Sequence, residues 1–296
     1  MSERRRPSGG PDRAGNADED LSLQEAADLL GVHYMTAYRY VRTGRLPARQ
    51  IGGTWHVRRS SLEAIAPPVA AGRAKRASAA SLAHYERRLE GYLVKGDQAE
   101  AWRLAQQALT SACTPEDLYL EVLGPALRRV GDDWAAGTVS VAEEHRASAL
   151  MSRLVGRLGP LLVRRGPTRG SVVIGAPEGD FHALASALVG DVLRGRGFSV
   201  IDLGANTPAV SFCEAMTESD RLVATGIVVS APIADAAIEA TIGAMKVASD
   251  VPLLLGGCAI RDDAHARRLG ADAGTSTARA AVEWFEAAPR PVRRRT

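Results

Sequence analysis

The chain has 296 residues, a formal net charge of +3 and an apolar content of 46%, which indicate a globular protein of about two or three domains. It has no apolar run of the roughly 18 residues that a membrane span needs. Its three cysteines are widely spaced and form no CxxC pair, which argues against a disulfide framework and a zinc site. The opening residues, MSERRRPSGG, lack the hydrophobic core of a signal peptide. We therefore expect a cytoplasmic protein.

The composition of the chain changes several times along its length. Residues 1–20 are polar and rich in Gly and Pro, which is typical of a disordered tail. The segments that follow are a compact patterned segment at 21–66, a Pro- and Ala-rich linker at 67–80, a helical segment at 81–165, a region of alternating strands and helices at 169–288, and a short basic tail at 289–296. The sequence therefore predicts a multidomain protein.

The segment 21–66 has the pattern of a winged helix-turn-helix. A capping box formed by Ser22 and Glu25 opens one short helix, and a second short helix ends at Gly44. Gly52-Gly53 then separates two runs of strand character, which predicts a hairpin with a two-residue turn. We expect this hairpin to be the wing.

The charge of this segment favours contact with double-stranded DNA. Between Leu29 and Leu62 there are six arginines and no acidic residue, and arginine neutralises phosphates and reads guanine. The alternative is a solvated basic face on a protein-binding module. The segment resembles the excisionase-like and MerR-like winged helix families. The side chains expected to contact DNA are Tyr34, Thr36, Tyr38, Arg39 and Arg42 from the second helix, and Arg49, Trp55 and Arg58 from the wing.

The segment 81–165 has helical periodicity and almost no strand signal, which predicts a four-helix bundle. Thr114-Pro115 is typical of a helix start, and Ser140 with Glu143 forms a capping box at the start of the last helix. The helices are expected near residues 81–94, 97–112, 115–135 and 141–164.

Short continuous apolar runs, separated by helical stretches, characterise residues 169–288. The runs are SVVIGA, FSVIDLG, LVATGIVVS, VPLLLGG and GADAG. Continuous rather than alternating apolar strands indicate a parallel sheet that is buried on both faces. We expect a doubly wound α/β domain of the flavodoxin-like kind, with its ligand site beyond the carboxyl ends of the strands.

The loop after the first of these strands contains a possible metal ligand. His182 can offer one ring nitrogen to a metal, while Asp180 accepts the proton of the other nitrogen and so fixes the tautomer. An isolated Asp-x-His pair also has purely structural explanations.

The wider pattern resembles the DxHxxG, SxL and GG motifs of cobalamin-binding domains. Asp180 and His182 are followed by Ser230 at the end of the third strand and by Gly256 and Gly257 at the end of the fourth. The resemblance implies that His182 is the lower cobalt ligand, and that the serine and the glycines line a slot for the displaced nucleotide tail. The chain departs from the pattern at Ala185, where the family has glycine, and at Pro232, where it often has leucine.

The helical segment resembles the cap of adenosylcobalamin photoreceptor repressors of the CarH and LitR type. Trp134 is followed after nine residues by Glu144 and His145, and the resemblance implies that these side chains converge over the upper face of the cofactor. The alternative is a core tryptophan beside an acidic helix start. Ala135 stands where the photoreceptors have a histidine that can capture cobalt after photolysis.

These observations favour a light-responsive, adenosylcobalamin-dependent transcription regulator. We expect a repressor that acts on double-stranded DNA as a homo-oligomer, for example a tetramer. We do not expect an enzyme, because no nucleophile–base pair, P-loop or dinucleotide motif is present. The alternatives are a regulator whose corrinoid domain is degenerate and serves for oligomerisation, and a corrinoid methyl carrier.

Overall fold

A computed structural model describes residues 20–30, 34–42, 44, 46–63, 77–111, 113–164 and 166–288 of the chain. The contacts divide the chain into two compact units, residues 1–74 and 75–296. The predicted basic tail and most of the predicted N-terminal tail and linker lie outside the described residues.

The first unit contains two helices followed by a hairpin and a short helix, in the predicted order. Its elements are β1 (Asp20–Ser22), α1 (Leu23–Leu29), α2 (Tyr34–Arg42), β2 (Ala48–Ile51), β3 (Thr54–Arg58) and α3 (Arg59–Glu63). Gly52 and Gly53 have φ values of 56° and 86°, the left-handed conformation that a two-residue hairpin turn requires. The prediction missed β1, which pairs with β3 and completes an antiparallel sheet of order β1-β3-β2. Residues 20–22 therefore belong to the folded unit.

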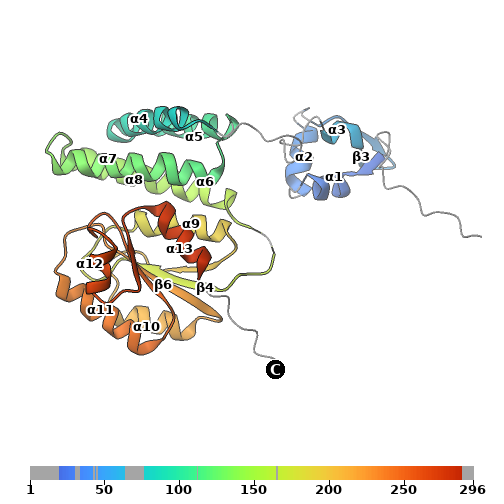
Figure 1. Cartoon of the computed structure of the whole chain (residues 1–296). Coiled ribbons are helices and arrows are strands. Elements are labelled where there is room, and N and C mark those ends of the chain that lie inside the picture. Colours follow the sequence, from blue (N-terminus) through green and yellow to red (C-terminus); the bar gives the residue numbers. More distant parts are fainter. Residues whose placement is uncertain are drawn as a thin grey trace, which may run out of the picture. The chain divides into compact units, whose positions relative to one another are not determined.

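The second unit begins with a helical bundle, shown in green in Figure 1. Its helices are α4 (Ala79–Lys95), α5 (Gln98–Thr110), α6 (Pro115–Leu118), α7 (Gly124–Ala135) and α8 (Val141–Leu158). The capping boxes and N-caps form as predicted: the Ser140 side chain accepts the Glu143 N–H while Glu143 accepts the Ser140 N–H, and the Thr114 side chain accepts the Asp117 N–H.

Two of the predicted bundle helices need correction. The last helix ends at Leu158 rather than at residue 164, because Gly159-Pro160 turns the chain into a 3-10 helix at Gly159–Leu161. The third predicted helix is divided by a π-helical turn at Tyr119–Leu123, directly before Gly124 and Pro125. Because a π turn contains an extra residue, it changes which side chains face the core, and here it buries Tyr119 with its hydroxyl 3.0 Å from the Asp191 carboxylate.

The α/β part has the predicted five-stranded parallel sheet. Its strands are β4 (Ser171–Gly175), β5 (Ser199–Asp202), β6 (Leu222–Val228), β7 (Leu253–Gly256) and β8 (Ala273–Thr275), in the order β5-β4-β6-β7-β8. Its helices are α9 (Leu184–Gly195), α10 (Ala209–Glu218), α11 (Asp235–Ala248), α12 (Asp263–Arg268) and α13 (Ala278–Ala287). This is the flavodoxin-like order, in which ligands bind beyond the carboxyl ends of the strands.

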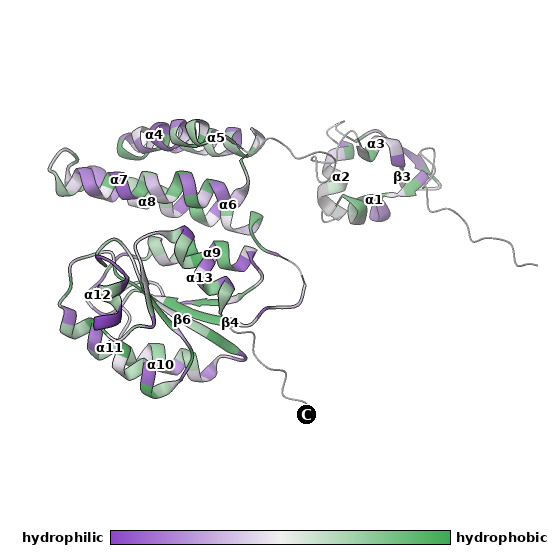
Figure 2. Ribbon diagram, viewed as in Figure 1, coloured by the Kyte–Doolittle hydropathy of each residue, from purple (hydrophilic) through white to green (hydrophobic). Residues whose placement is uncertain are grey.

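The second unit is layered. Helices α9 and α13 lie between the bundle and the sheet, and α10, α11 and α12 cover the opposite face (Figure 1). The strands β4 and β6 are coloured hydrophobic in Figure 2, as expected for strands that are buried on both faces. One continuous core runs from Tyr85 and Leu89 of the bundle to Val282 and Phe285 of α13. The bundle is therefore part of the α/β unit and not a separately packed domain.

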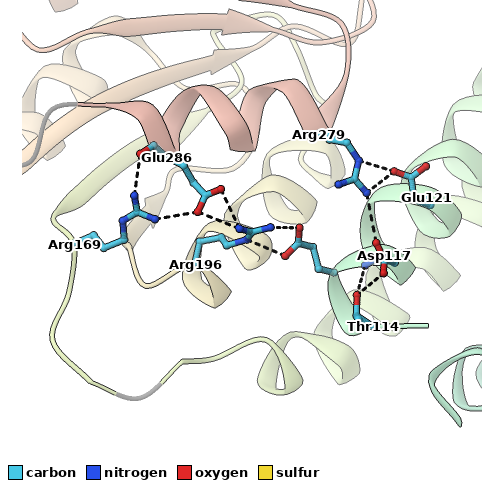
Figure 3. Close-up of polar contacts among 8 residues, drawn as sticks. Thr114, Asp117, Glu121, Arg169, Arg196, Arg279 and Glu286 are labelled. Carbon is cyan, nitrogen blue, oxygen red and sulfur yellow. Dashed lines mark hydrogen bonds and ion pairs between the residues drawn. The ribbon is translucent and has the colours of Figure 1, made fainter. Parts of the chain in front are cut away.

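Ion pairs join the bundle to the amino edge of the sheet (Figure 3). The Arg196 guanidinium lies between two carboxylates: its Nε donates to Glu116 at 2.9 Å, and another nitrogen lies 3.0 Å from Glu286. Arg169 also contacts Glu286, at 3.0 Å. The hydrogen bond to Glu116 is the main reason why the pKa of Arg196 is raised. This edge holds the bundle in place by paired charges.

Candidate cofactor site and DNA-binding surface

His182 lies in the loop 176–183 between β4 and α9, called here the His182 loop. Its Nδ1 is 2.7 Å from Asp180 Oδ1, and since an ionised carboxylate only accepts hydrogen bonds, Nδ1 carries the proton of the neutral ring. That tautomer leaves the lone pair on Nε2, for which the described residues supply no hydrogen-bond partner. The side chain is 54% exposed. The predicted pair therefore forms, with Nε2 free to bind a metal.

Asp180 connects the His182 loop to the end of β6. Its side chain is fully buried, and its second oxygen, Oδ2, accepts the backbone N–H groups of Ser230 at 2.5 Å and Ala231 at 3.2 Å. Its Oδ1 also accepts the His182 N–H at 3.0 Å. A buried carboxylate needs such partners, and these hold it in one orientation. The link to Ser230 uses the main chain, which the sequence pattern did not indicate.

Of the two glycines at the end of β7, Gly257 is needed for close packing against the end of β6. A Cβ on Gly257 would lie 2.1 Å from the Val229 carbonyl oxygen, and Gly257 has a φ of 114°. A Cβ on Gly256 would lie 3.4 Å from the Thr275 carbonyl oxygen. Only glycine therefore fits at position 257. That these glycines also line a nucleotide slot remains a prediction.

Contacts along the bundle show that it runs from the amino edge of the sheet to the carboxyl edge. Glu116 contacts Arg196 at the amino edge, Glu121 contacts Arg279 at the start of α13, and Arg128 donates to the carbonyl oxygen of Ser276, directly after β8, at 2.8 Å. Trp134 lies six residues beyond Arg128, or about 9 Å further along α7. The end of α7 and the start of α8, residues 128–148, are called the cap from here on.

The cap presents the three residues predicted to cover the cofactor. Glu144 accepts the Ser148 hydroxyl at 2.6 Å and lies 2.8 Å from His145 Nδ1. Trp134 is 49% exposed, and among the described residues no hydrogen bond or ring contact joins it to the other two. Glu144 and His145 thus contact each other, and the convergence of all three side chains over a cofactor stays a prediction. The prediction missed Ser148, which the four-residue spacing from Glu144 could have indicated.

The geometry fits a corrinoid better than a protein-bound metal ion. Within the described residues, no group of three or more His, Cys, Asp or Glu side chains could hold a metal ion. A corrin supplies its own equatorial nitrogens, so a single imidazole suffices as a protein ligand. Phe181, the residue before His182, is 74% exposed, and Val141 in the cap is 57% exposed.

The first unit presents some of its predicted DNA-contacting residues on the surface. Arg42 and Arg58 are exposed, whereas Tyr38 and Trp55 pack partly against the core of the unit. Arg49 is ion-paired with Asp20 of β1, so it has to leave that partner to contact a phosphate. The side chains of Tyr34, Thr36 and Arg39 lie outside the described residues, and their roles stay predictions.

Two protein families match parts of the chain, and the first match lies in the bundle and not in the His182 loop. Residues 85–158 match the B12 binding domain family, and residues 21–66 match a helix-turn-helix domain family. The chain thus contains a B12-binding domain together with a helix-turn-helix motif, which supports cobalamin binding and suggests DNA binding. In the described part of the chain, none of the helices has the length and hydropathy required for a transmembrane span.

Several similar proteins are corrinoid proteins of Methanosarcina. Trimethylamine corrinoid protein 1 of Methanosarcina mazei is 25% identical over 197 residues, which are 65% of this chain and 91% of that protein. The trimethylamine corrinoid protein of Methanosarcina barkeri is 26% identical over 197 residues, 65% of this chain and 90% of that protein. The structure of the Methanosarcina barkeri monomethylamine corrinoid protein covers 69% of this chain and 97% of its own, with a TM-score of 0.60 and 20% identity. That likeness shows a shared fold.

Proposed function

We propose that this protein is a cobalamin-dependent transcription regulator, and that His182 binds cobalt through Nε2. The observation that carries the proposal is the Nδ1 contact of an exposed His182 with a fully buried carboxylate, Asp180, at the carboxyl edge of the sheet, in a chain that also contains a helix-turn-helix motif. A bound corrinoid supplies a cobalt centre that holds either a light-sensitive cobalt–carbon bond or a transferable methyl group.

In this proposal the cap recognises the upper ligand, which is an adenosyl group. Glu144 is oriented by Ser148 and His145, so its carboxylate is positioned before a ligand arrives, and the exposed ring of Trp134 offers an apolar surface. Ordering these groups in advance lowers the entropy cost of binding. The chain has Ala135 after Trp134, so a light response does not use a histidine at that position.

Regulation requires that the cofactor prefers one state of the protein. A shift from mostly inactive to mostly active protein needs a differential affinity of about 5 kcal/mol. We propose that the cofactor favours a homo-oligomer, in which several first units bind one DNA molecule and gain affinity through effective concentration. Release of the upper ligand by light then weakens DNA binding, which describes a repressor.

Reconstitution with adenosylcobalamin in darkness tests the cofactor part of this proposal. We expect His182→Ala to weaken cobalamin binding at least about tenfold. In protein with ¹⁵N-labelled histidine loaded with Co(II) cobalamin, the variant should also lose the doublet that a ¹⁵N ligand gives in the electron paramagnetic resonance spectrum, a signal that the cofactor's own nitrogen base cannot produce. His84→Ala, an exposed histidine on α4, is the matched control. An unchanged spectrum in His182→Ala contradicts the assignment of this ligand.

DNA binding is tested by gel retardation with fragments of the source genome, before and after green light, with and without cofactor. Replacing Arg42 or Arg58 by Ala should lower the salt dependence of binding by about one ion each, because each phosphate contact releases about one counterion. If the retardation of DNA is the same with and without cofactor, the proposed regulatory role is contradicted. The proposal that the protein binds cobalamin is not affected by that result.

The second candidate function is that of a corrinoid methyl carrier. The relatives favour it, because two trimethylamine corrinoid proteins align with this chain over about nine tenths of their own length. In the presence of a partner methyltransferase, a carrier loaded with methylcobalamin should transfer its methyl group to an acceptor thiol, which loses its proton while the cobalt is left as Co(I). Such a carrier should bind DNA no more tightly than the isolated second unit does. The helix-turn-helix motif at 21–66 favours the regulator.

A further inference from the structure

The His182 loop is held by a second set of contacts, on the side away from β6. The loop after β5, residues 203–207, runs beside it: Ala176 N–H donates to the Gly204 carbonyl at 2.7 Å, and Thr207 N–H donates to the Ala176 carbonyl at 2.9 Å. A parallel bridge joins Pro177 and Thr207. The pairing of β4 with β5 therefore continues beyond the ends of both strands.

Asn206 closes this pairing at the residues that orient His182. Its backbone N–H donates to the Asp180 carbonyl at 2.7 Å, and its side-chain Oδ1 accepts the Gly179 N–H at 2.8 Å. The two bonds fix the main chain directly before and at Asp180. Because Asp180 Oδ1 in turn accepts from His182, the position of the ring depends on where this main chain lies.

The conformation of Asn206 explains why this residue type is present. Its φ is 51°, in the left-handed region. Asparagine and aspartate adopt that region several-fold more readily than most other residues with a side chain, and they also place an oxygen within reach of a neighbouring N–H. Glycine would supply the backbone conformation without the acceptor, and alanine would supply neither.

Resting on the proposed function of His182 as cobalt ligand, we propose that Asn206 is a positioning residue for that ligand. Asp180 is thus fixed from two sides: its carboxylate by the main chain after β6 and its backbone by the loop after β5. With both contacts present, the imidazole has one orientation before cobalt binds. Loss of the Asn206 contact frees the His182 loop and lets the imidazole ring adopt other orientations.

Four variants separate this role from a general loss of stability. Asn206→Ala removes the side-chain acceptor and strains the backbone, whereas Asn206→Gly removes the acceptor without backbone strain. Asn206→Asp retains an acceptor oxygen and also tolerates the left-handed backbone. Arg221→Ala is the matched control, because Arg221 has a φ of 55° and is the other left-handed residue with a side chain in the described part of the chain. It precedes β6 at the opposite, amino edge of the sheet.

The first measurement uses protein without cofactor and records the nitrogen chemical shifts of ¹⁵N-labelled histidine, with His182→Ala for assignment. We expect wild type, Asn206→Asp and Arg221→Ala to show His182 with its proton on Nδ1. In Asn206→Ala and Asn206→Gly the shifts of the two ring nitrogens should move toward each other, as expected for mixed tautomers.

The second measurement uses Co(II) cobalamin as the probe. Asn206→Ala should bind it about tenfold more weakly, which is the lower end of the range for residues that support a metal ligand. A smaller fraction of the bound cobalt should show splitting by the nitrogen of ¹⁵N-labelled histidine. Asn206→Asp should restore both. If Asn206→Ala leaves the ring shifts and the splitting as in wild type, and only lowers stability as Arg221→Ala does, the proposal is overturned. If wild type binds no cobalamin, the proposed function fails, and the shifts of the cofactor-free protein still decide the role of Asn206.

Discussion

The two edges of the parallel sheet use polar side chains differently. At the amino edge, Arg196 lies between Glu116 and Glu286, and Arg169 reaches the same Glu286. At the carboxyl edge, His182 is held on one side by Asp180 and is 54% exposed on the other. The charges that fix the bundle on the sheet are thus paired with opposite charges of the protein, whereas the candidate ligand leaves its Nε2 open.

This difference separates contacts that stabilise from contacts that bind. A polar side chain whose hydrogen-bond partners all belong to the protein contributes mainly to the free energy of unfolding. A side chain that keeps a lone pair without a protein partner can instead use it to bind a ligand such as a metal. Asp180 belongs to both groups, because it is buried like a structural residue and also orients the exposed His182.

The largest effect is expected for Asp180→Ala. It leaves the N–H groups of Ser230 and Ala231 without their acceptor, and the free energy of unfolding should fall by about 2–3 kcal/mol. Cobalamin affinity should fall about 10- to 100-fold, because the ring of His182 loses its orienting partner. Chemical denaturation and absorbance titration measure the two effects. Asp202→Ala removes a single contact to Gly204 N–H at the same edge. It should therefore lower both the free energy of unfolding and the cobalamin affinity by less than Asp180→Ala does.

Arg196→Ala tests the amino edge alone. It breaks the link between Glu116 and Glu286, and because these groups are partly exposed the loss should be about 1–2 kcal/mol. Cobalamin affinity should change less than about threefold, because Arg196 lies at the amino edge of the sheet and the candidate cofactor site lies at the carboxyl edge. Arg103→Ala, in an exposed pair with Glu100 on α5, should cost less than about 0.5 kcal/mol. A loss of affinity as large as that of Asp180→Ala would break the distinction between the edges.

Glu143→Gln should make the stability of the cap less dependent on pH. The Ser140 N–H donates to Glu143 and lowers the pKa of that carboxyl below its ordinary value of 4.5. A lowered pKa contributes stability above pH 4.5 that disappears as the pH falls through the lower value. Melting temperatures of wild type and variant should therefore differ at pH 7 and converge as the pH falls through the lowered pKa of Glu143. Exposed Glu239, changed to Gln, is the control; a constant difference across this range contradicts the capping role.

Trp134→Ala should have the smallest effect on stability, about 0.5 kcal/mol, because the ring is half-exposed. Its effect on cobalamin should be larger, about tenfold in affinity, if the cofactor covers the exposed half of the ring. Isothermal titration and thermal melts give both values. A variant that melts much earlier while binding cobalamin normally would place Trp134 among the stabilising residues instead.

Most elements of the fold were predictable because their signals are local. The continuous apolar runs identified all five parallel strands, and the Ser140–Glu143 capping box marks the start of α8. The incorrect boundaries arose where two local signals compete: helical periodicity continues past Leu158, while Gly159-Pro160 ends the helix. The strand β1 was missed because three residues carry too little pattern, and its pairing with β3 spans more than thirty residues.

The sequence by itself indicated the pairing of Asp180 with His182, because an Asp-x-His pair in the loop after a strand puts the carboxylate within reach of the ring. Only the tertiary structure decided that the same carboxylate binds the main chain at Ser230, that Asn206 fixes the backbone of Asp180, and that Arg128 brings the cap to Ser276. These contacts join residues 26 to 148 positions apart, so they depend on strand order and helix packing. No periodicity or spacing along the chain encodes such distances.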